Sequence, residues 1–159
     1  MVKRVSSAGS NAYTAGLAQA VAVPVKCFII MSFSGNTLVA KNYNYLYMPI
    51  FEKNNVEPCR IDRKSIPGQS ITDHIFSNIE SSDIVLADLT EDRENCYFEL
   101  RYAFTLKNPV IITKMAAPKY EFSLPFDIQN FQCIIFGDID DLRGKCVKVL
   151  SDSIMPFIL

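Results

Sequence analysis

Short apolar runs alternate along the chain with longer segments in which apolar residues recur every three or four positions. Runs of the first kind predict buried strands, and the recurring stripes predict helices. Strands are expected at 26–33, 56–62, 83–89, 109–113 and 131–136, and helices at about 38–54, 71–82, 96–106 and 139–153. Pro58 in the second run favours an edge position for that strand, because proline cannot donate to a sheet ladder.

The alternation of strands and helices predicts an α/β fold, with a longer loop at 114–129 before the last strand. Right-handed crossovers then give a doubly wound, mainly parallel five-stranded sheet with helices on both faces. Ligands of such sheets bind at the carboxyl ends of the strands, so the loops SFSGN, LTEDREN and KMAAP are expected to gather there. None of them contains GxGxxG or GxxxxGK[ST], which argues against a dinucleotide-binding Rossmann site and a P-loop.

The length of 159 residues fits one domain, which we place at 24–159 after a flexible N-terminal arm at 1–23. The net charge of −1 argues against a nucleic-acid polymer as partner, since phosphate binding usually shows as a basic excess. A membrane partner is not expected either, because no apolar stretch is long enough to span a bilayer.

The sequence contains five cysteines, an odd number, without a CxxC pair. Several lie in apolar runs, which indicates buried free thiols in a reducing compartment and hence a cytoplasmic protein. A metal site is not expected, because His74 is the only histidine and no cysteine pair has ligand spacing. No cofactor is indicated.

Candidate chemistry lies in the acidic segment after the third predicted strand. Asp88 ends that strand, and Glu99 is expected in the first turn of the helix at 96–106, where the helix N-terminus would keep its carboxylate ionised. An ionised carboxylate can attack an anomeric carbon, and a nearby anion stabilises the oxocarbenium-like transition state. Asp73, early in the preceding helix, could supply a proton to a leaving base.

Each of these residues also has a purely structural interpretation. An aspartate at a strand end, such as Asp88, often braces a loop, and Asp73 is well placed to cap a helix. Glu99 could simply complement the helix dipole. Tyr97 is a candidate platform for stacking on a base, but an aromatic residue at this spacing more often packs on a helix face. The residues alone leave these alternatives open.

A combined pattern resembles a known family. The segments that carry it are CFIIMSF, SITDHIFSNIESSDIVLADLT, NCYFELRYAFTLKNPVIIT and LPFDIQNFQCIIF. Over about residues 25–136 they resemble the nucleoside 2-deoxyribosyltransferase-like superfamily, especially its TIR-like nucleotide-binding branch. The usual motif is Asp-Leu-Thr, a short loop, an Asn, aromatic residues and Glu-Leu-Gly-x-Ala. Here it reads DLT at 88–90, then Asn95, Tyr97, Phe98, Glu99 and Leu100, with Ala103 in the last position.

The resemblance implies a flavodoxin-like fold and N-glycosidic chemistry on nucleosides or nucleotides. It implies that Glu99 attacks C1′ of the sugar and that Asp73 assists departure of the base. Contacts to sugar or base are implied for Asp88 and Asn95. The residues implied to line the pocket from the first strand are Met31, Ser32 and Phe33. Such enzymes often pair subunits, so a homodimer or higher homo-oligomer is expected.

One residue departs from the motif, because Arg101 stands where the glycine after Glu-Leu usually lies. Its guanidinium could bind a phosphate, which would favour a nucleotide over a nucleoside. It could equally block the pocket or face solvent on the helix.

The first hypothesis is therefore a nucleotide or nucleoside N-glycosidase, either hydrolase or deoxyribosyltransferase, with Glu99 as nucleophile. The alternatives are a non-catalytic TIR-like module that binds a nucleotide as sensor or assembly domain, and an NAD-cleaving TIR-like enzyme.

Overall fold

The computed structural model describes residues 23–32, 37–61, 68, 70–116 and 124–158. The predicted arm at 1–23 lies outside these ranges except for Val23, so it stays a prediction. The candidate pocket residue Phe33 also lies outside the described residues.

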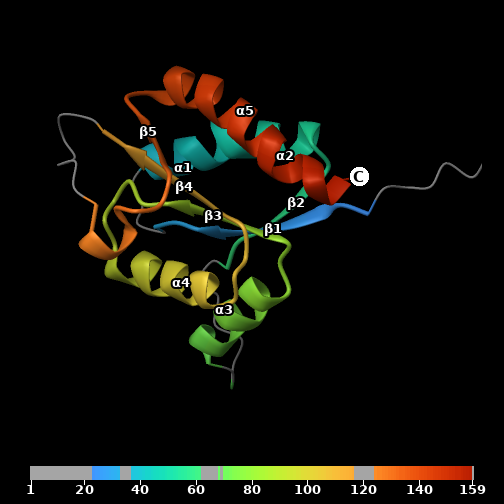
Figure 1. The fold of residues 1–159 in the computed structure, drawn as a ribbon, viewed down its shortest axis with the longest axis vertical. Coiled ribbons are helices and arrows are strands. Elements are labelled where there is room, and N and C mark those ends of the chain that lie inside the picture. Colours follow the sequence, from blue (N-terminus) through green and yellow to red (C-terminus); the bar gives the residue numbers. More distant parts are fainter. Residues whose placement is uncertain (1–22, 33–36, 62–67, 69, 117–123, 159) are drawn as a thin grey trace, which may run out of the picture.

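A five-stranded parallel sheet forms the centre of the fold (Figure 1). Its strands are β1 (Val25–Ile30), β2 (Val56–Cys59), β3 (Ile84–Asp88), β4 (Val110–Met115) and β5 (Cys133–Phe136). Their order in the sheet is β2-β1-β3-β4-β5. The chain adds β2 on one side of β1 and then β3, β4 and β5 on the other side, so the strand order reverses at β1 and β3, as in a doubly wound flavodoxin-like fold. The predicted fold class is confirmed, and Pro58 lies in an edge strand as expected.

Helices cover both faces of this sheet (Figure 1). One face carries α1 (Thr37–Lys41), the π-helical segment η1 (Asn42–Tyr47), α2 (Met48–Lys53) and α5 (Ile139–Ile158). The other face carries α3 (Ile71–Glu80) and α4 (Glu94–Thr105), and a short 3-10 turn, η2 (Phe126–Ile128), precedes β5. Two separate apolar clusters result, because alternate residues of the buried central strands point to opposite faces.

Two boundaries differ from the expected ones in ways that affect the site. Helix α4 begins at Glu94 and not at Cys96, so Glu99 lies in its second turn. Strand β4 continues beyond Thr113 to Met115, and the side chain of Lys114 within it is fully buried. A lysine in this position reads as a loop residue unless its partner is known, and its partner is Asp92 in the loop after β3.

None of the helices among the described residues has the length and apolar character needed to cross a bilayer. Four cysteines, Cys27, Cys59, Cys96 and Cys133, are free thiols.

Candidate functional site

The carboxyl end of β3 is held by a buried hydrogen-bond network around Asp88, which is only 2% exposed. Its Oδ1 accepts from the backbone N–H of Thr90 at 3.0 Å and from the Thr90 hydroxyl at 2.5 Å. Its Oδ2 accepts from the hydroxyl of Tyr47 at 2.9 Å and from the amide of Asn42 at 3.3 Å. The Asp-Leu-Thr motif is thus a local turn in which the aspartate side chain bonds the backbone two residues on. Asp88 therefore braces the sheet edge from within.

The loop that follows is fixed by a second contact, from the sheet to Asp92. The ammonium of Lys114 lies 2.5 Å from Oδ1 of Asp92, and the hydroxyl of Tyr97 donates to the same oxygen. Asp92 has a left-handed backbone, with φ of 51°, a conformation that aspartate tolerates better than most residues. These contacts set the direction in which the chain enters α4.

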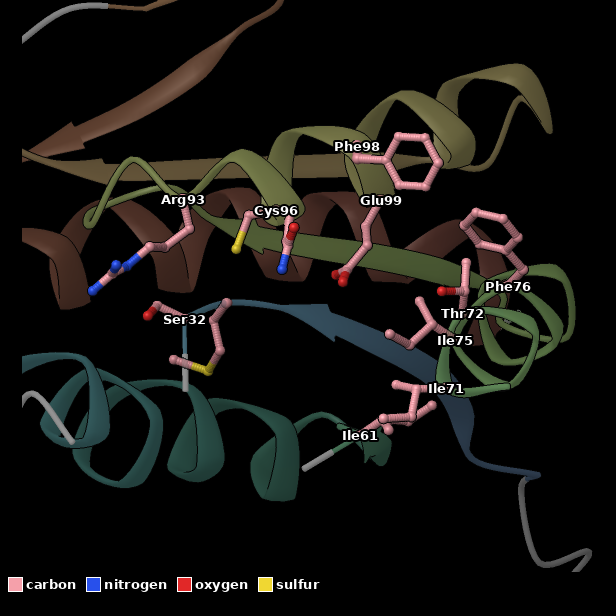
Figure 2. Close-up of a pocket in the computed structure, with 12 residues that line it drawn as sticks. Ser32, Ile61, Ile71, Thr72, Ile75, Phe76, Arg93, Cys96, Phe98 and Glu99 are labelled. Carbon is pink, nitrogen blue, oxygen red and sulfur yellow. The ribbon is translucent and has the colours of Figure 1, made fainter. Parts of the chain in front are cut away.

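A cavity of about 580 Å³ opens beside this loop, between the start of α4, the end of β1 and helix α3 (Figure 2). Its size is within the range of small-molecule sites, about 300–1,000 Å³. The lining residues are Met31, Ser32, Ile61, Ile71, Thr72, Ile75, Phe76, Arg93, Asn95, Cys96, Phe98 and Glu99. The cavity lies at the point where strand order reverses, which is where open α/β sheets bind their ligands.

Glu99 supplies the only carboxylate among the described lining residues, and Figure 2 shows it pointing from α4 into the cavity. Within the described part of the chain, its carboxylate oxygens accept no hydrogen bond and form no ion pair. Burial raises the pKa of Glu99 from 4.5 to about 7. The expectation that the helix N-terminus keeps this carboxylate fully ionised is wrong, because the helix-dipole effect falls off within the first turn and Glu99 lies in the second. Desolvation then dominates its pKa.

The two ends of the cavity differ in chemistry. Figure 2 shows Arg93 at one end, Ile71, Ile75 and Phe76 at the other, and the Glu99 carboxylate between them. Nε of Arg93 lies 3.4 Å from the Glu91 carboxylate, and the guanidinium is largely exposed. The aromatic end is firm, because the ring of Phe76 stacks on Tyr102 with centroids 3.9 Å apart.

Cys96 also lines the cavity close to the start of α4. Burial raises the pKa of its thiol to about 12, so it remains protonated at neutral pH. Because the thiolate is the reactive form, Cys96 acts as a wall residue and not as a nucleophile.

The structure brings together some of the residues predicted from the sequence and separates others. Those that share the cavity are Met31, Ser32, Asn95 and Glu99. Asp88 is buried within the sheet edge and is not among the described lining residues. Asp73 is exposed on α3, where its backbone N–H is capped by the Ser70 hydroxyl at 3.4 Å, and it too is absent from the described lining.

Tyr97 and Arg101 lie along a different, shallower hollow of about 350 Å³ on another side of α4. The guanidinium of Arg101 forms an ion pair with Asp127 there. Its side chain therefore neither blocks the cavity that contains Glu99 nor reaches into it. In the part of the chain described, Phe98 is the residue that borders both hollows.

Sequence reasoning missed Arg93 and the wall supplied by α3. Ile71, Ile75 and Ile79 lie at helical spacing on α3, but Ile79 is fully buried while Ile71 is 39% exposed. The stripe extends beyond the sheet edge, so its first turns border the cavity.

Comparison with known proteins places this geometry in a family. The family model for the TIR domain matches residues 26–113, more than half of the chain. A search of curated protein sequences found no significant match.

Three solved structures share the fold at low sequence identity. The TIR domain of a Toll-related receptor from Hydra magnipapillata is 15% identical, with a TM-score of 0.61, over 81% of this chain and 97% of that one. A CMP N-glycosidase from Clostridium botulinum is 14% identical, with a TM-score of 0.53, over 76% and 96%. A 2-deoxyribosyltransferase from Bacillus psychrosaccharolyticus is 14% identical, with a TM-score of 0.55, over 76% and 91%.

The resemblance seen in the sequence is thereby confirmed, since both its TIR-like branch and its deoxyribosyltransferase-like superfamily are represented. Identities this low establish the fold and leave activity to be argued from the site. On the match over residues 26–113, the chain belongs to the TIR domain family.

Proposed function

We propose that this TIR domain cleaves the N-glycosidic bond of a nucleoside or nucleotide, with Glu99 as nucleophile. The observation that carries the proposal is a carboxylate without an internal partner among the described residues, directed into a cavity at the ligand edge of the sheet. A half-buried carboxylate without a partner costs folding free energy, so its retention there favours a role toward a ligand. Two structural neighbours are named as a CMP N-glycosidase and a 2-deoxyribosyltransferase, and both names denote reactions at an N-glycosidic bond.

In the proposed reaction, a carboxylate oxygen of Glu99 forms a bond to C1′ as the bond from C1′ to the base nitrogen breaks. The base leaves with the bonding electron pair and takes a proton. Water or a second base then attacks C1′ and regenerates the carboxylate. The partial negative charge on Glu99 stabilises the oxocarbenium character of C1′ in the transition state of each step.

The pKa of about 7 makes Glu99 half ionised near neutral pH. The ionised fraction attacks readily, because a desolvated carboxylate is not shielded by bound water. A carboxylate buried to this degree is therefore suited to the role, although the helix dipole does not assist it.

The apolar end of the cavity is the proposed place for the base. Ile71, Ile75 and Phe76 offer flat and branched apolar surfaces, against which an aromatic base can pack. Asn95 offers an amide that both donates and accepts, which suits contacts to sugar hydroxyls. Asp73 remains the proposed proton donor, and movement of α3 toward the substrate would be needed for it to reach the base.

A second candidate is nucleotide binding without cleavage. The observation that favours it is the position of Asp73, which is exposed and outside the described lining of the cavity. A site that holds a nucleotide but lacks a proton donor for the base would bind without turnover.

The test is incubation of the protein with pooled nucleosides, nucleoside monophosphates and NAD, followed by mass spectrometry for free bases. Release of a free base supports the proposal, and release of nicotinamide identifies the NAD-cleaving version. Saturable binding of a pool member without any base release would replace the first candidate by the second.

Closure of the cavity by a second copy of the chain is also proposed. Phe98 on its rim is a large apolar side chain that is 59% exposed, a surface that a second copy could cover. Sedimentation velocity of the wild type and of Phe98→Ser tests this, because self-association through this rim should weaken in the variant.

A further inference from the structure

We propose that the substrate carries a phosphate on its 5′ carbon and that Arg93 binds this phosphate. The inference rests on the proposed function, because it assigns substrate chemistry to the same cavity. It shifts the role of phosphate ligand from Arg101, considered from the sequence, to a residue that the motif does not include.

The order of groups along the cavity carries the inference. A cation lies at one end, the Glu99 carboxylate in the middle and apolar side chains at the other end (Figure 2). A 5′-phosphorylated nucleoside has the same order of chemistry, with an anion, a sugar that becomes positively charged at C1′, and an aromatic base. With C1′ at Glu99 and the base against Ile75 and Phe76, the 5′ substituent extends toward Arg93.

The spacing along α4 agrees with this arrangement. Arg93 immediately precedes the helix and Glu99 lies six positions further on. At a rise of about 1.5 Å per residue, their backbones are separated by roughly 9 Å along the axis. The two side chains therefore reach different parts of one small ligand and do not compete for the same atom.

The guanidinium of Arg93 is available for a new partner. Its Nε lies 3.4 Å from the Glu91 carboxylate, a long contact, and its side chain is 58% exposed. The Glu91 side chain is only 6% exposed, so this contact holds the Nε side of the guanidinium. The Nη atoms donate to no residue among those that the structure describes, so a phosphate could take two parallel hydrogen bonds from them.

Other arginines near the sheet edge are committed elsewhere. The guanidinium of Arg60 lies 4.1 Å from the centroid of the Tyr43 ring, and its Nη1 donates to the sulfur of Met31 at 3.8 Å. Arg101 is paired with Asp127 along the other hollow. Arg93 is the one arginine among the described lining residues of this cavity.

The first test compares base release from a nucleoside and from its own 5′-monophosphate, using the pair whose base is released fastest from the pool. Wild-type protein should show kcat/KM at least about 100-fold higher for the monophosphate. Arg93→Gln should reduce that preference at least 10-fold, mainly by raising KM for the monophosphate. Arg93→Lys should restore only part of the preference, because an ammonium lacks the two-pronged geometry.

Arg143→Gln is the matched control, since it removes an exposed arginine from α5 on the opposite face of the sheet.

NAD is tested as a separate substrate, because its 5′-diphosphate could bind Arg93 in the same way. If Arg93→Gln lowers kcat/KM more for NAD than for any monophosphate, the phosphate that Arg93 binds belongs to a dinucleotide. Equal rates on nucleoside and monophosphate in the wild type, or loss of preference in Arg60→Gln and not in Arg93→Gln, would overturn the inference.

A binding measurement separates this inference from the proposed function. Calorimetric titration of Glu99→Gln protein, with and without Arg93→Gln, uses each nucleoside of the pool and its own 5′-monophosphate. If the wild type releases no base but Arg93→Gln weakens monophosphate binding at least 10-fold, cleavage fails and the phosphate site stands. If base is released but phosphate improves neither binding nor rate, the phosphate site fails and cleavage stands.

Discussion

The hydroxyl of Tyr47 lies 2.9 Å from Oδ2 of Asp88, and this buried contact joins the π-helical segment η1 to the end of β3. The same hydroxyl lies 2.8 Å from the hydroxyl of Thr113 on β4, so one phenol links a helix to two neighbouring strands. The carboxylates of Asp88 and Glu99 thus have different roles. Asp88 accepts internal hydrogen bonds on both oxygens, whereas Glu99 faces the cavity.

Replacement of Asp88 by asparagine should destabilise the fold. The amide has one acceptor oxygen for the four donors that now meet the carboxylate, and its own N–H groups would face some of them. Leaving buried donors unpaired predicts a loss of about 2–4 kcal/mol in the free energy of unfolding, measured by urea denaturation. Asp140→Asn is the control and should change this energy by less than about 0.5 kcal/mol, since that carboxylate is 91% exposed. Equal effects of the two variants would contradict the bracing role.

Stability should fall with rising pH because of Glu99. Its pKa is about 7 in the folded protein and near 4.5 when solvated, so the folded state binds more protons between these values. The contribution of the neutral carboxyl is fully present below about pH 4.5 and is lost as pH rises through 7. Glu99→Gln should therefore be more stable than the wild type at pH 8, by on the order of 1–2 kcal/mol after allowance for water in the cavity, and about equal at pH 4.5.

Urea denaturation at both pH values checks this prediction. Glu52→Gln, on the exposed side of α2, controls for the loss of one carboxylate. A gain in stability for Glu99→Gln that is the same at pH 4.5 and pH 8 would mean that its ionisation is not the cause.

The rate of base release should follow the ionisation of the same group. If Glu99 attacks as a carboxylate, kcat/KM should rise about tenfold per pH unit below pH 6 and become level above pH 8. Stopped assays across pH 5–9 measure the profile. A rate that falls as pH rises through 7 would instead assign Glu99 the role of a proton donor.

The apolar wall of the cavity should affect substrate binding more than stability. Ile71 is 39% exposed, so Ile71→Ala should change the free energy of unfolding by less than about 0.5 kcal/mol. Loss of its contact with the base should raise KM about three- to tenfold. Ile135→Ala is the matched control, because Ile135 on β5 is 37% exposed and is not among the described residues that line the cavity. A similar KM for both variants would remove α3 from the site.

Most strands and helices could be predicted because their apolar runs and stripes are local signals in the sequence. Glu99 could be placed at the ligand edge for the same reason. Its pKa could not be predicted, because it depends on where α4 begins and on how deeply α3 and β1 enclose the carboxylate. A shift of two residues in the start of α4 was enough to move Glu99 from the first turn to the second.

The roles of Arg93 and Arg101 also depended on three-dimensional position. Arg93 immediately precedes α4 and Arg101 is its eighth residue. They line different hollows because eight positions, at 3.6 residues per turn, put Arg101 about two turns further along and on a different side of the helix. Arg101 meets Asp127 from a segment 26 residues further along the chain, a contact without a local signal. Lys114 was likewise read as a loop residue, because its burial depends on Asp92 from another loop.

The most direct measurement is kcat/KM for base release by wild type and by Glu99→Gln, with Glu52→Gln as control. The substrate is the member of the nucleoside and nucleotide pool whose base is released fastest. Loss of activity by at least about 1,000-fold in Glu99→Gln, with intact folding and wild-type activity in the control, is the expected result. Base release by folded Glu99→Gln at the wild-type rate would contradict the assignment of this carboxylate as the nucleophile.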